Sequence, residues 1–72
     1  MHLQQLVSTL KRRREELKVT QEQLADLSGV GLRTLKALES KKSNPTLATL
    51  SRLADVLGME IRLEIKKTNH EI

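Results

Sequence analysis

The segment GVGLRTLKALESKKSNP, residues 29–45, holds the side chains best suited to bind a negatively charged partner. Arg33 and Lys36 are three residues apart and would share one face of a helix, while Leu35 and Leu38 would share another. Lysine and arginine bind phosphate groups, and arginine also donates paired hydrogen bonds to base edges. The pattern predicts a short helix with an apolar side against a core and a basic side facing outward.

Catalytic and metal-binding chemistry have no comparable support in the sequence. Ser8, Thr9 and the scattered carboxylates do not form a nucleophile with a base and an orienting group. The chain has no cysteine, and its histidines, His2 and His70, lie near the ends. Residues 28–31, SGVG, follow a predicted helix and lack the glycine spacing of a phosphate-binding loop. We therefore expect no enzyme activity, no metal site and no cofactor.

The composition narrows the class of partner. There are 13 Lys and Arg against 9 Asp and Glu, with a pI of about 9.9, so the chain is basic enough to be attracted to polyanions. It has no Phe, Trp or Tyr, the side chains on which proteins that bind single strands stack the bases. If the partner is a nucleic acid, duplex DNA is favoured.

The length predicts one small domain. Chains as short as these 72 residues bury only about 60% of the surface that their unfolded form exposes, so oligomerisation is the favoured way to add buried area. No apolar run approaches the roughly 20 residues of a membrane span, and the basic cluster at residues 11–14 follows the apolar residues, unlike a secretory signal. We expect a cytoplasmic protein, associated with the nucleoid if it binds DNA.

Apolar residues at steps of three and four predict helices, and the capping residues mark their ends. Thr20, with Gln23 three residues later, matches a capping box, and Gly29 is suited to end the helix that follows. Thr46 is the expected cap of the last helix, which Gly58 ends. The predicted helices cover residues 3–18, 21–28, 32–40 and 47–57.

The residues after Gly58 change to a two-residue period, which is typical of a strand. Apolar side chains alternate there with charged ones, and the apolar positions are Met59, Ile61, Leu63 and Ile65. We expect an all-α domain with one C-terminal β-strand. The predicted divisions are a helix-turn-helix domain over 1–58, a dimerisation strand over 59–67 and a flexible tail over 68–72.

Residues 21–40 have the spacing of a helix-turn-helix, whose second helix enters the major groove of DNA. Ala25 is small enough for close packing of the two helices, Gly29 makes the turn, and Val30 fills the space beneath. A helical wheel turns part of the second helix inward, namely Thr34, Leu35 and Leu38. It leaves Leu32, Arg33, Lys36 and Ala37 on the outer arc.

The segment TQEQLADLSGVGLRTLKALESKKSNPTLATLSRLADVLGM, Thr20 to Met59, resembles the Cro/CI or XRE family of helix-turn-helix proteins, with the λ-repressor-like fold. The resemblance implies sequence-specific binding to duplex DNA by a transcriptional repressor or autoregulator. It implies a phosphate contact from Gln21 and further backbone contacts from the loop after the recognition helix. The candidate DNA-binding residues are Gln21, Gly31, Leu32, Arg33, Thr34, Lys36, Lys41, Lys42, Ser43 and Asn44.

Two positions depart from the family pattern, and one pair of residues matches it. Family members often carry Ser or Thr at the position of Gly31 and a polar residue at that of Leu32, so a base contact from Leu32 is limited to a thymine methyl. Arg14 and Glu39 match a family ion pair, which we interpret as structural because it fixes the angle of the recognition helix. A nearby basic run, residues 11–13, is more typical of a solvated helix face than of a phosphate contact.

An isolated strand needs a partner for its backbone groups, and the same strand of a second copy is the simplest one. We expect a two-fold homodimer on a palindromic operator, with Met59, Ile61, Leu63 and Ile65 at the interface. The helical domain followed by GMEIRLEI also resembles HipB-type antitoxins, which implies a HipA-like kinase toxin as a partner. The alternative is a protein-protein interaction adaptor whose helix-turn-helix no longer binds DNA.

Overall fold

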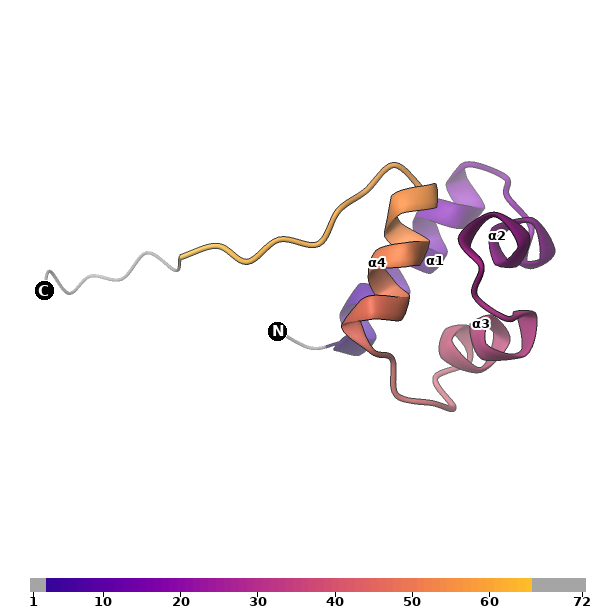
Figure 1. Ribbon diagram of the computed structural model, residues 1–72, viewed down its shortest axis with the longest axis horizontal. Coiled ribbons are helices and arrows are strands. Elements are labelled where there is room, and N and C mark those ends of the chain that lie inside the picture. Colours follow the sequence, from indigo (N-terminus) through magenta and orange to yellow (C-terminus); the bar gives the residue numbers. More distant parts are fainter. Residues whose placement is uncertain (1–2, 66–72) are drawn as a thin grey trace, which may run out of the picture.

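The computed structural model describes residues 3–65, which form four helices. The helices are α1 (Leu3–Glu16), α2 (Gln21–Ser28), α3 (Leu32–Glu39) and α4 (Leu47–Val56). Figure 1 shows α4 in front of α1, with α2 and α3 at one end of the molecule. None of the four helices is both long and apolar enough to span a membrane. The expected tail over 68–72 and the last two residues of the expected strand lie outside the described residues.

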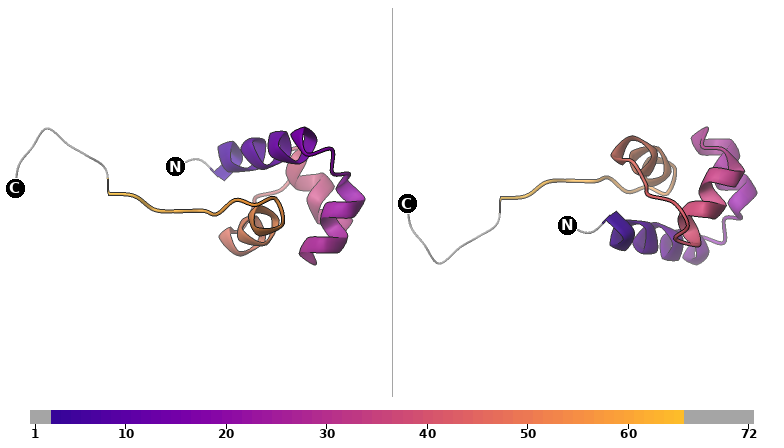
Figure 2. Two further views of the ribbon diagram at one scale, coloured as in Figure 1. Left: turned by 90° about the horizontal axis from the view of Figure 1, so that it is seen from above. Right: turned by 90° about the horizontal axis from the view of Figure 1, so that it is seen from below.

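Leucines from all the helices and from the turn after α4 form the core. Helix α2 contacts α3 and α4, and α1 contacts the same two helices. Seen from above and below, α1 and α4 flank one side of this core while α2 and α3 close its end (Figure 2). The most deeply buried side chains are Leu24, Leu35, Leu38, Leu50 and Leu57. A core shared in this way fixes α3 against α1 and α2.

The predicted starts of α2 and α4 are confirmed by their caps. Thr20 Oγ1 accepts a hydrogen bond from Gln23 N (3.0 Å), and Gln23 Oε1 accepts one from Thr20 N (2.9 Å), which completes the capping box. Thr46 Oγ1 accepts from Thr49 N (3.1 Å) at the start of α4. Each cap satisfies a backbone donor that the helix itself cannot pair.

All four helices are followed by a residue in the left-handed conformation, but only two of these residues are glycine. Gly29 (φ 75°) follows α2 and Gly58 (φ 73°) follows α4, whereas Lys18 (φ 58°) and Lys41 (φ 61°) follow α1 and α3. At Lys41, two backbone hydrogen bonds close the last turn, from Lys41 N to Leu38 O and from Lys42 N to Ala37 O. These turns end α1 and α3 slightly before the predicted positions.

The predicted C-terminal strand is absent from residues 59–65, which leave the helical body as an extended segment (Figure 1). A strand is defined by hydrogen bonds to a neighbouring strand, and residues 3–65 of a single chain supply none. The two-residue alternation is nevertheless present. Met59 and Ile61 are half-buried against the core, while Glu60 and Arg62 are exposed and pair with each other.

Candidate nucleic-acid interface

Helices α2 and α3 form the predicted helix-turn-helix. The left-handed Gly29 donates its N–H to Ala25 O (3.0 Å) and turns the chain, and after Gly31 the second helix begins. Ala25 and Val30 are both buried between these helices and the core, at 8% and 7% exposure. The small Ala25 side chain and the three-residue break therefore set the position of α3, as the spacing predicted.

The outer face of α3 differs in part from the helical wheel. Arg33 and Lys36 are exposed, as predicted, but Thr34 is exposed too, and Leu32 is partly buried against the core. The burial is centred on Leu35, so its i−3 neighbour Leu32 lies on the same face while Thr34 is about 100° away. The inward position predicted for Thr34 and the outward position predicted for Leu32 are both wrong.

Gly31 lies at the N-terminus of α3 with an extended backbone, φ −61° and ψ 143°, and no side chain within residues 3–65 caps this start. A Cβ atom at this position would lie 3.8 Å from Thr34 Oγ1, an ordinary contact. Packing therefore does not require glycine here. The first backbone N–H groups of α3 point out of the helix end, where the dipole favours a negative group.

The loop between α3 and α4 lies beside this face. Its residues Lys41, Lys42, Ser43 and Asn44 are all exposed, and Pro45 is buried beneath them. A shallow groove runs between the loop and α3, lined by Arg33, Thr34 and Ala37 from the helix and by Ser43–Thr46 and Thr49 from the other side. On the α1 side, Gln4 Nε2 makes a long hydrogen bond of 3.5 Å to Ser43 O.

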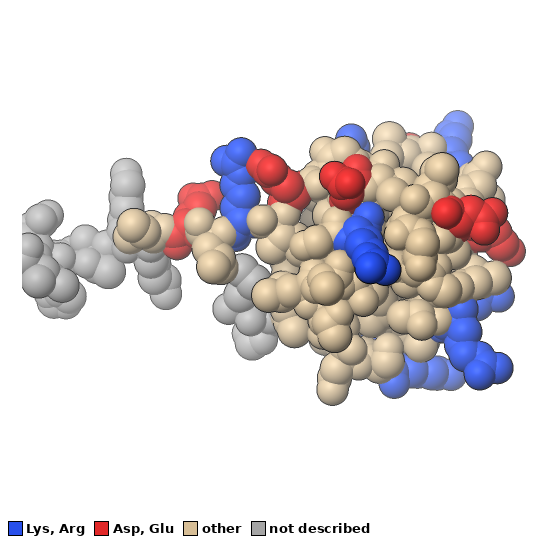
Figure 3. Space-filling view, viewed as in Figure 1, with Lys and Arg blue, Asp and Glu red and all other residues tan. Residues whose placement is uncertain are grey.

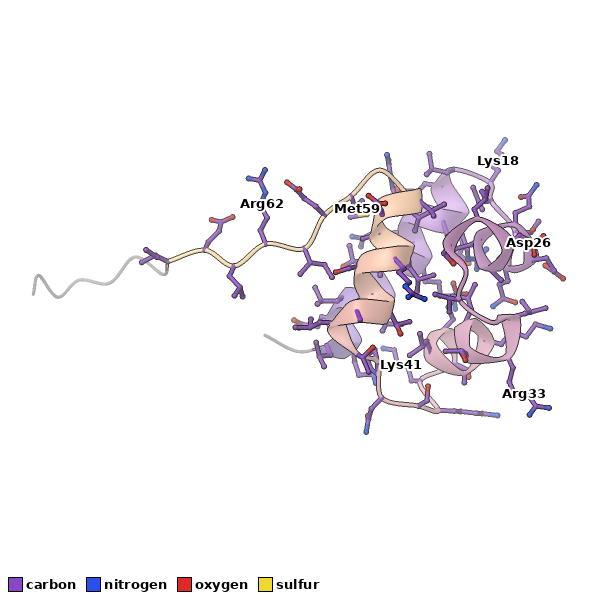
Figure 4. All side chains as sticks on the ribbon, viewed as in Figure 1. Lys18, Asp26, Arg33, Lys41, Met59 and Arg62 are labelled. Carbon is purple, nitrogen blue, oxygen red and sulfur yellow. The ribbon has the colours of Figure 1, made fainter. Side chains whose placement is uncertain are left out.

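Figure 3 shows a group of blue side chains at the lower right, around α3 and its loop, with red ones above them on the α2 side. Further blue side chains lie at the centre and at the upper right of that view. Figure 4 identifies Arg33 and Lys41 on the lower side and Asp26 and Lys18 on the upper side. The structure thus brings the cations of α3 and of the loop to one side of the molecule.

A buried ion pair joins α1 to the end of α3. Arg14 Nε lies 2.8 Å from Glu39 Oε2, and Arg14 Nη2 lies 2.8 Å from Glu39 Oε1, which makes the pair bidentate. The side chains of Arg14 and Glu39 are only 11% and 6% exposed. The third donor, Arg14 Nη1, binds Val19 O (2.8 Å) in the turn before α2. The predicted partners therefore meet, with the fork geometry that arginine favours.

The sequence did not reveal that Gln21 belongs to this network. Gln21 Nε2 donates to Glu39 Oε1 at 2.9 Å, although the two residues are 18 positions apart. Burial raises the pKa of Glu39, but the hydrogen bonds from Arg14 and Gln21 and the nearby positive charge outweigh it, so the pKa is lowered. The hydrogen bond to Glu39 and the nearby carboxylates raise the pKa of Arg14, against its burial.

One cation of the basic run has a structural role. Arg13 Nε donates to Leu57 O (3.2 Å) and so satisfies a carbonyl at the end of α4. Its guanidinium group also lies beside Gly58, where the C-terminal segment begins. These contacts tie Arg13 to the C-terminal end of α4, while Arg12 is exposed.

Comparison with known proteins agrees with this architecture. A helix-turn-helix family model matches residues 10–63, which include α2, α3 and α4. A relative from Methanothermobacter thermautotrophicus, named as an uncharacterized HTH-type transcriptional regulator, is 41% identical over 51 residues, which cover 71% of this chain and 74% of the relative. With the two helices, their glycine turn and the Arg14–Glu39 pair in place, the chain belongs to the XRE (Cro/CI-type) helix-turn-helix family.

Proposed function

We propose that the protein binds duplex DNA in a sequence-specific way and regulates transcription as a repressor or autoregulator. The observation that carries the proposal is the exposed basic face of α3 beside the exposed loop 41–44, on a helix that the core holds rigidly. An α-helix fits the major groove, and cations beside it can contact the flanking phosphates. The name of the relative from Methanothermobacter thermautotrophicus supports the regulatory role.

The geometry supports two roles among the candidate residues, namely contacts to base edges and contacts to phosphates. Arg33, Thr34 and Lys36 are exposed on α3 and would contact base edges, whereas the half-buried Leu32 would offer at most an apolar contact to a thymine methyl. The phosphate contacts would come from the N–H groups at the starts of α2 and α3 and from the loop. These contacts are assigned to Gln21, Gly31, Lys41, Lys42, Ser43 and Asn44.

We test these two roles by measuring the affinity of three alanine variants for sequences selected from random duplex DNA. Arg33→Ala should cost roughly 1–3 kcal/mol and relax the preference at one base position. Lys41→Ala should weaken binding to all sequences alike and make the salt dependence shallower by about one unit. Lys18→Ala is the matched control, because Lys18 is also exposed and left-handed but lies on the opposite side (Figure 4).

Two outcomes would contradict this assignment. A uniform loss across sequences in both Arg33→Ala and Lys41→Ala would mean that α3 is not the recognition helix. Absence of salt-dependent binding by the parent protein would favour the interaction adaptor, in which the helices serve only protein contacts.

A homodimer on a palindromic operator extends the proposal. The segment 59–65 supports it, because apolar and charged side chains alternate there and the last two apolar ones have no cover within residues 3–65. Leu63 is 89% exposed and Ile65 is 98% exposed. An antiparallel pair centred on Leu63 would place Arg62 opposite Glu64 of the second copy, which is an attractive charged pair. Centring the pair on Arg62 or on Glu64 would oppose like charges.

A strand pair centred on Leu63 can be tested by the rate of disulfide cross-linking. Leu63→Cys places two thiols at the two-fold axis, and the variant should form an interchain disulfide readily under mild oxidation. Arg62→Cys and Glu64→Cys are the matched controls, one position to either side, and should cross-link more slowly. Equal cross-linking of the three variants would contradict the register.

An antitoxin role is a narrower form of this function. The C-terminal GMEIRLEI motif supports it through the HipB-type resemblance, and the partner would be a HipA-like kinase. A kinase gene next to that of this protein, and a complex of the two proteins that binds the shared operator more tightly than the regulator alone, would support it. A regulator whose neighbouring genes encode no such kinase would act without a toxin.

A further inference from the structure

We propose that Glu39 is a positioning residue for DNA binding, which orients the Gln21 side chain toward a phosphate. The proposal rests on the DNA-binding function inferred above and gives the buried ion pair a role beyond stabilising the fold. Gln21 is the first residue of α2, and it is one of the residues to which a phosphate contact is assigned above. Glu39 lies at the last position of α3 and is 9% exposed.

The Glu39 carboxylate accepts three hydrogen bonds, from two side chains. Its Oε2 accepts one hydrogen bond, from Arg14 Nε, and its Oε1 accepts two, from Arg14 Nη2 and Gln21 Nε2. The three distances are 2.8, 2.8 and 2.9 Å. Because Arg14 holds both carboxylate oxygens in one plane, the acceptor that Gln21 meets has a fixed position.

The chemistry of the Gln21 amide determines which of its groups faces Glu39. An ionised carboxylate only accepts hydrogen bonds, so the NH2 group of Gln21 must face Glu39, and the amide cannot turn over without losing this bond. The same NH2 group has a second N–H, which stays available for another acceptor. A phosphate oxygen is also only an acceptor, so this N–H is the donor that the Gln21 side chain can offer it.

The network also holds the backbone before Gln21. Arg14 Nη1 binds Val19 O at 2.8 Å, and the capping box of Thr20 and Gln23 follows directly. One partly buried arginine therefore fixes the turn that leads into α2, while its carboxylate partner fixes the first side chain of that helix. Preorganisation of this kind lowers the ordering cost when the contact forms.

The experiment separates positioning from folding by replacing the ion pair with apolar residues. Arg14→Met/Glu39→Leu removes both charges together, a change that commonly keeps or raises stability. Gln21→Ala is made in the parent and in this background, and affinity for the selected operator is measured for all four proteins. We expect Gln21→Ala to weaken binding about tenfold in the parent and by less than about twofold in the apolar background.

Lys42→Ala supplies the matched control, because Lys42 is an exposed loop cation for which no contact with the network is observed within residues 3–65. It should weaken binding equally in both backgrounds. An equal loss from Gln21→Ala in both backgrounds would overturn the proposal, as would an apolar-pair protein that binds like the parent. If Gln21→Ala has no effect in the parent, this proposal fails, while DNA binding itself is judged separately by Arg33→Ala and Lys41→Ala.

A measurement on the parent protein covers the case in which the apolar pair does not fold. The side-chain NH2 resonances of Gln21 should shift with pH as Glu39 protonates, because the acceptor loses its charge. The NH2 resonances of Gln23, whose Oε1 accepts from Thr20 N, should not follow this titration. Gln21 resonances that stay constant through the titration of Glu39 would overturn the proposal.

Discussion

The α2–α3 pair and the segment 59–65 carry similar aliphatic side chains, but these side chains have different surroundings. In the pair, Leu24, Leu35 and Leu38 are at most 2% exposed and the polar ends are tied by Arg14, Glu39 and Gln21. In the segment, the exposure of the aliphatic residues rises toward its end, to 89% at Leu63 and 98% at Ile65. The first region is complete within one chain, whereas the second has apolar surface that residues 3–65 do not cover.

The largest effect on stability should come from removing the Arg14–Glu39 ion pair of the first region. Arg14→Ala leaves the Glu39 carboxylate buried without its main partner, so we expect a loss of roughly 3–5 kcal/mol in the free energy of unfolding. Glu39→Ala should also destabilise, and the double change should cost less than the sum of the two. Denaturant unfolding measures this, and a coupling within about 0.3 kcal/mol of zero would contradict the geometry.

The next largest effect should come from the second region and should concern assembly. Leu63→Pro removes a backbone donor from the proposed strand pair, so we expect monomers in sedimentation and operator binding weakened by about 100-fold or more. Leu63→Val keeps a strand-forming residue and should remain dimeric. Unfolding of the helical body should change little in both variants. A Leu63→Pro protein that stays dimeric would show that the segment 59–65 does not form the dimer contact.

A smaller effect should follow from removing one helix cap. Thr20→Ala deletes the acceptor for Gln23 N, and we expect a loss of about 1 kcal/mol, within the usual range for N-caps. Thr46→Ala is the counterpart at α4 and should cost about the same. Thermal unfolding measures the loss of stability in both variants. Sedimentation should show the same oligomeric state as the parent protein, because neither cap lies in the segment 59–65.

The smallest effect we expect is a dependence of stability on pH in the acid range. The folded-state pKa of Glu39 is lowered, so its stabilisation is fully present above the unfolded-state pKa of about 4.3 and is lost as the pH falls through the folded-state value. The free energy of unfolding should therefore fall with acidification below this pH. The Arg14→Met/Glu39→Leu protein should lack this component, and an identical acid dependence in both proteins would contradict the assignment.

The sequence predicted most of the helix-turn-helix, because its determinants are local. A Thr with Gln three residues later marks the start of α2, and Gly29 marks its end. Repeating leucines mark the buried faces, and the family resemblance gave the Arg14–Glu39 pair. The contact of Gln21 with Glu39 could not be predicted in this way, because it joins residues 18 positions apart and depends on the final packing of α2 against α3.

The misplaced side chains have a different origin. The predicted inner arc of α3 runs from Thr34 through Leu38 to Leu35, whereas the burial is centred on Leu35 and extends to Leu32 and Glu39. A short helix offers too few apolar positions to fix the centre of its buried face. The alternation over residues 59–65 was real, but a period of two specifies which side chains share a face and does not supply the neighbouring strand.

The left-handed lysines after α1 and α3 have a consequence for engineering the protein. A side chain costs free energy in this conformation, and glycine does not, so Lys18→Gly should stabilise the domain by up to about 1 kcal/mol without loss of DNA affinity. Lys41→Gly should give a similar gain in stability but remove a proposed phosphate contact. At position 41 a more stable protein would thus be a weaker DNA binder, whereas at position 18 the two properties can be improved independently.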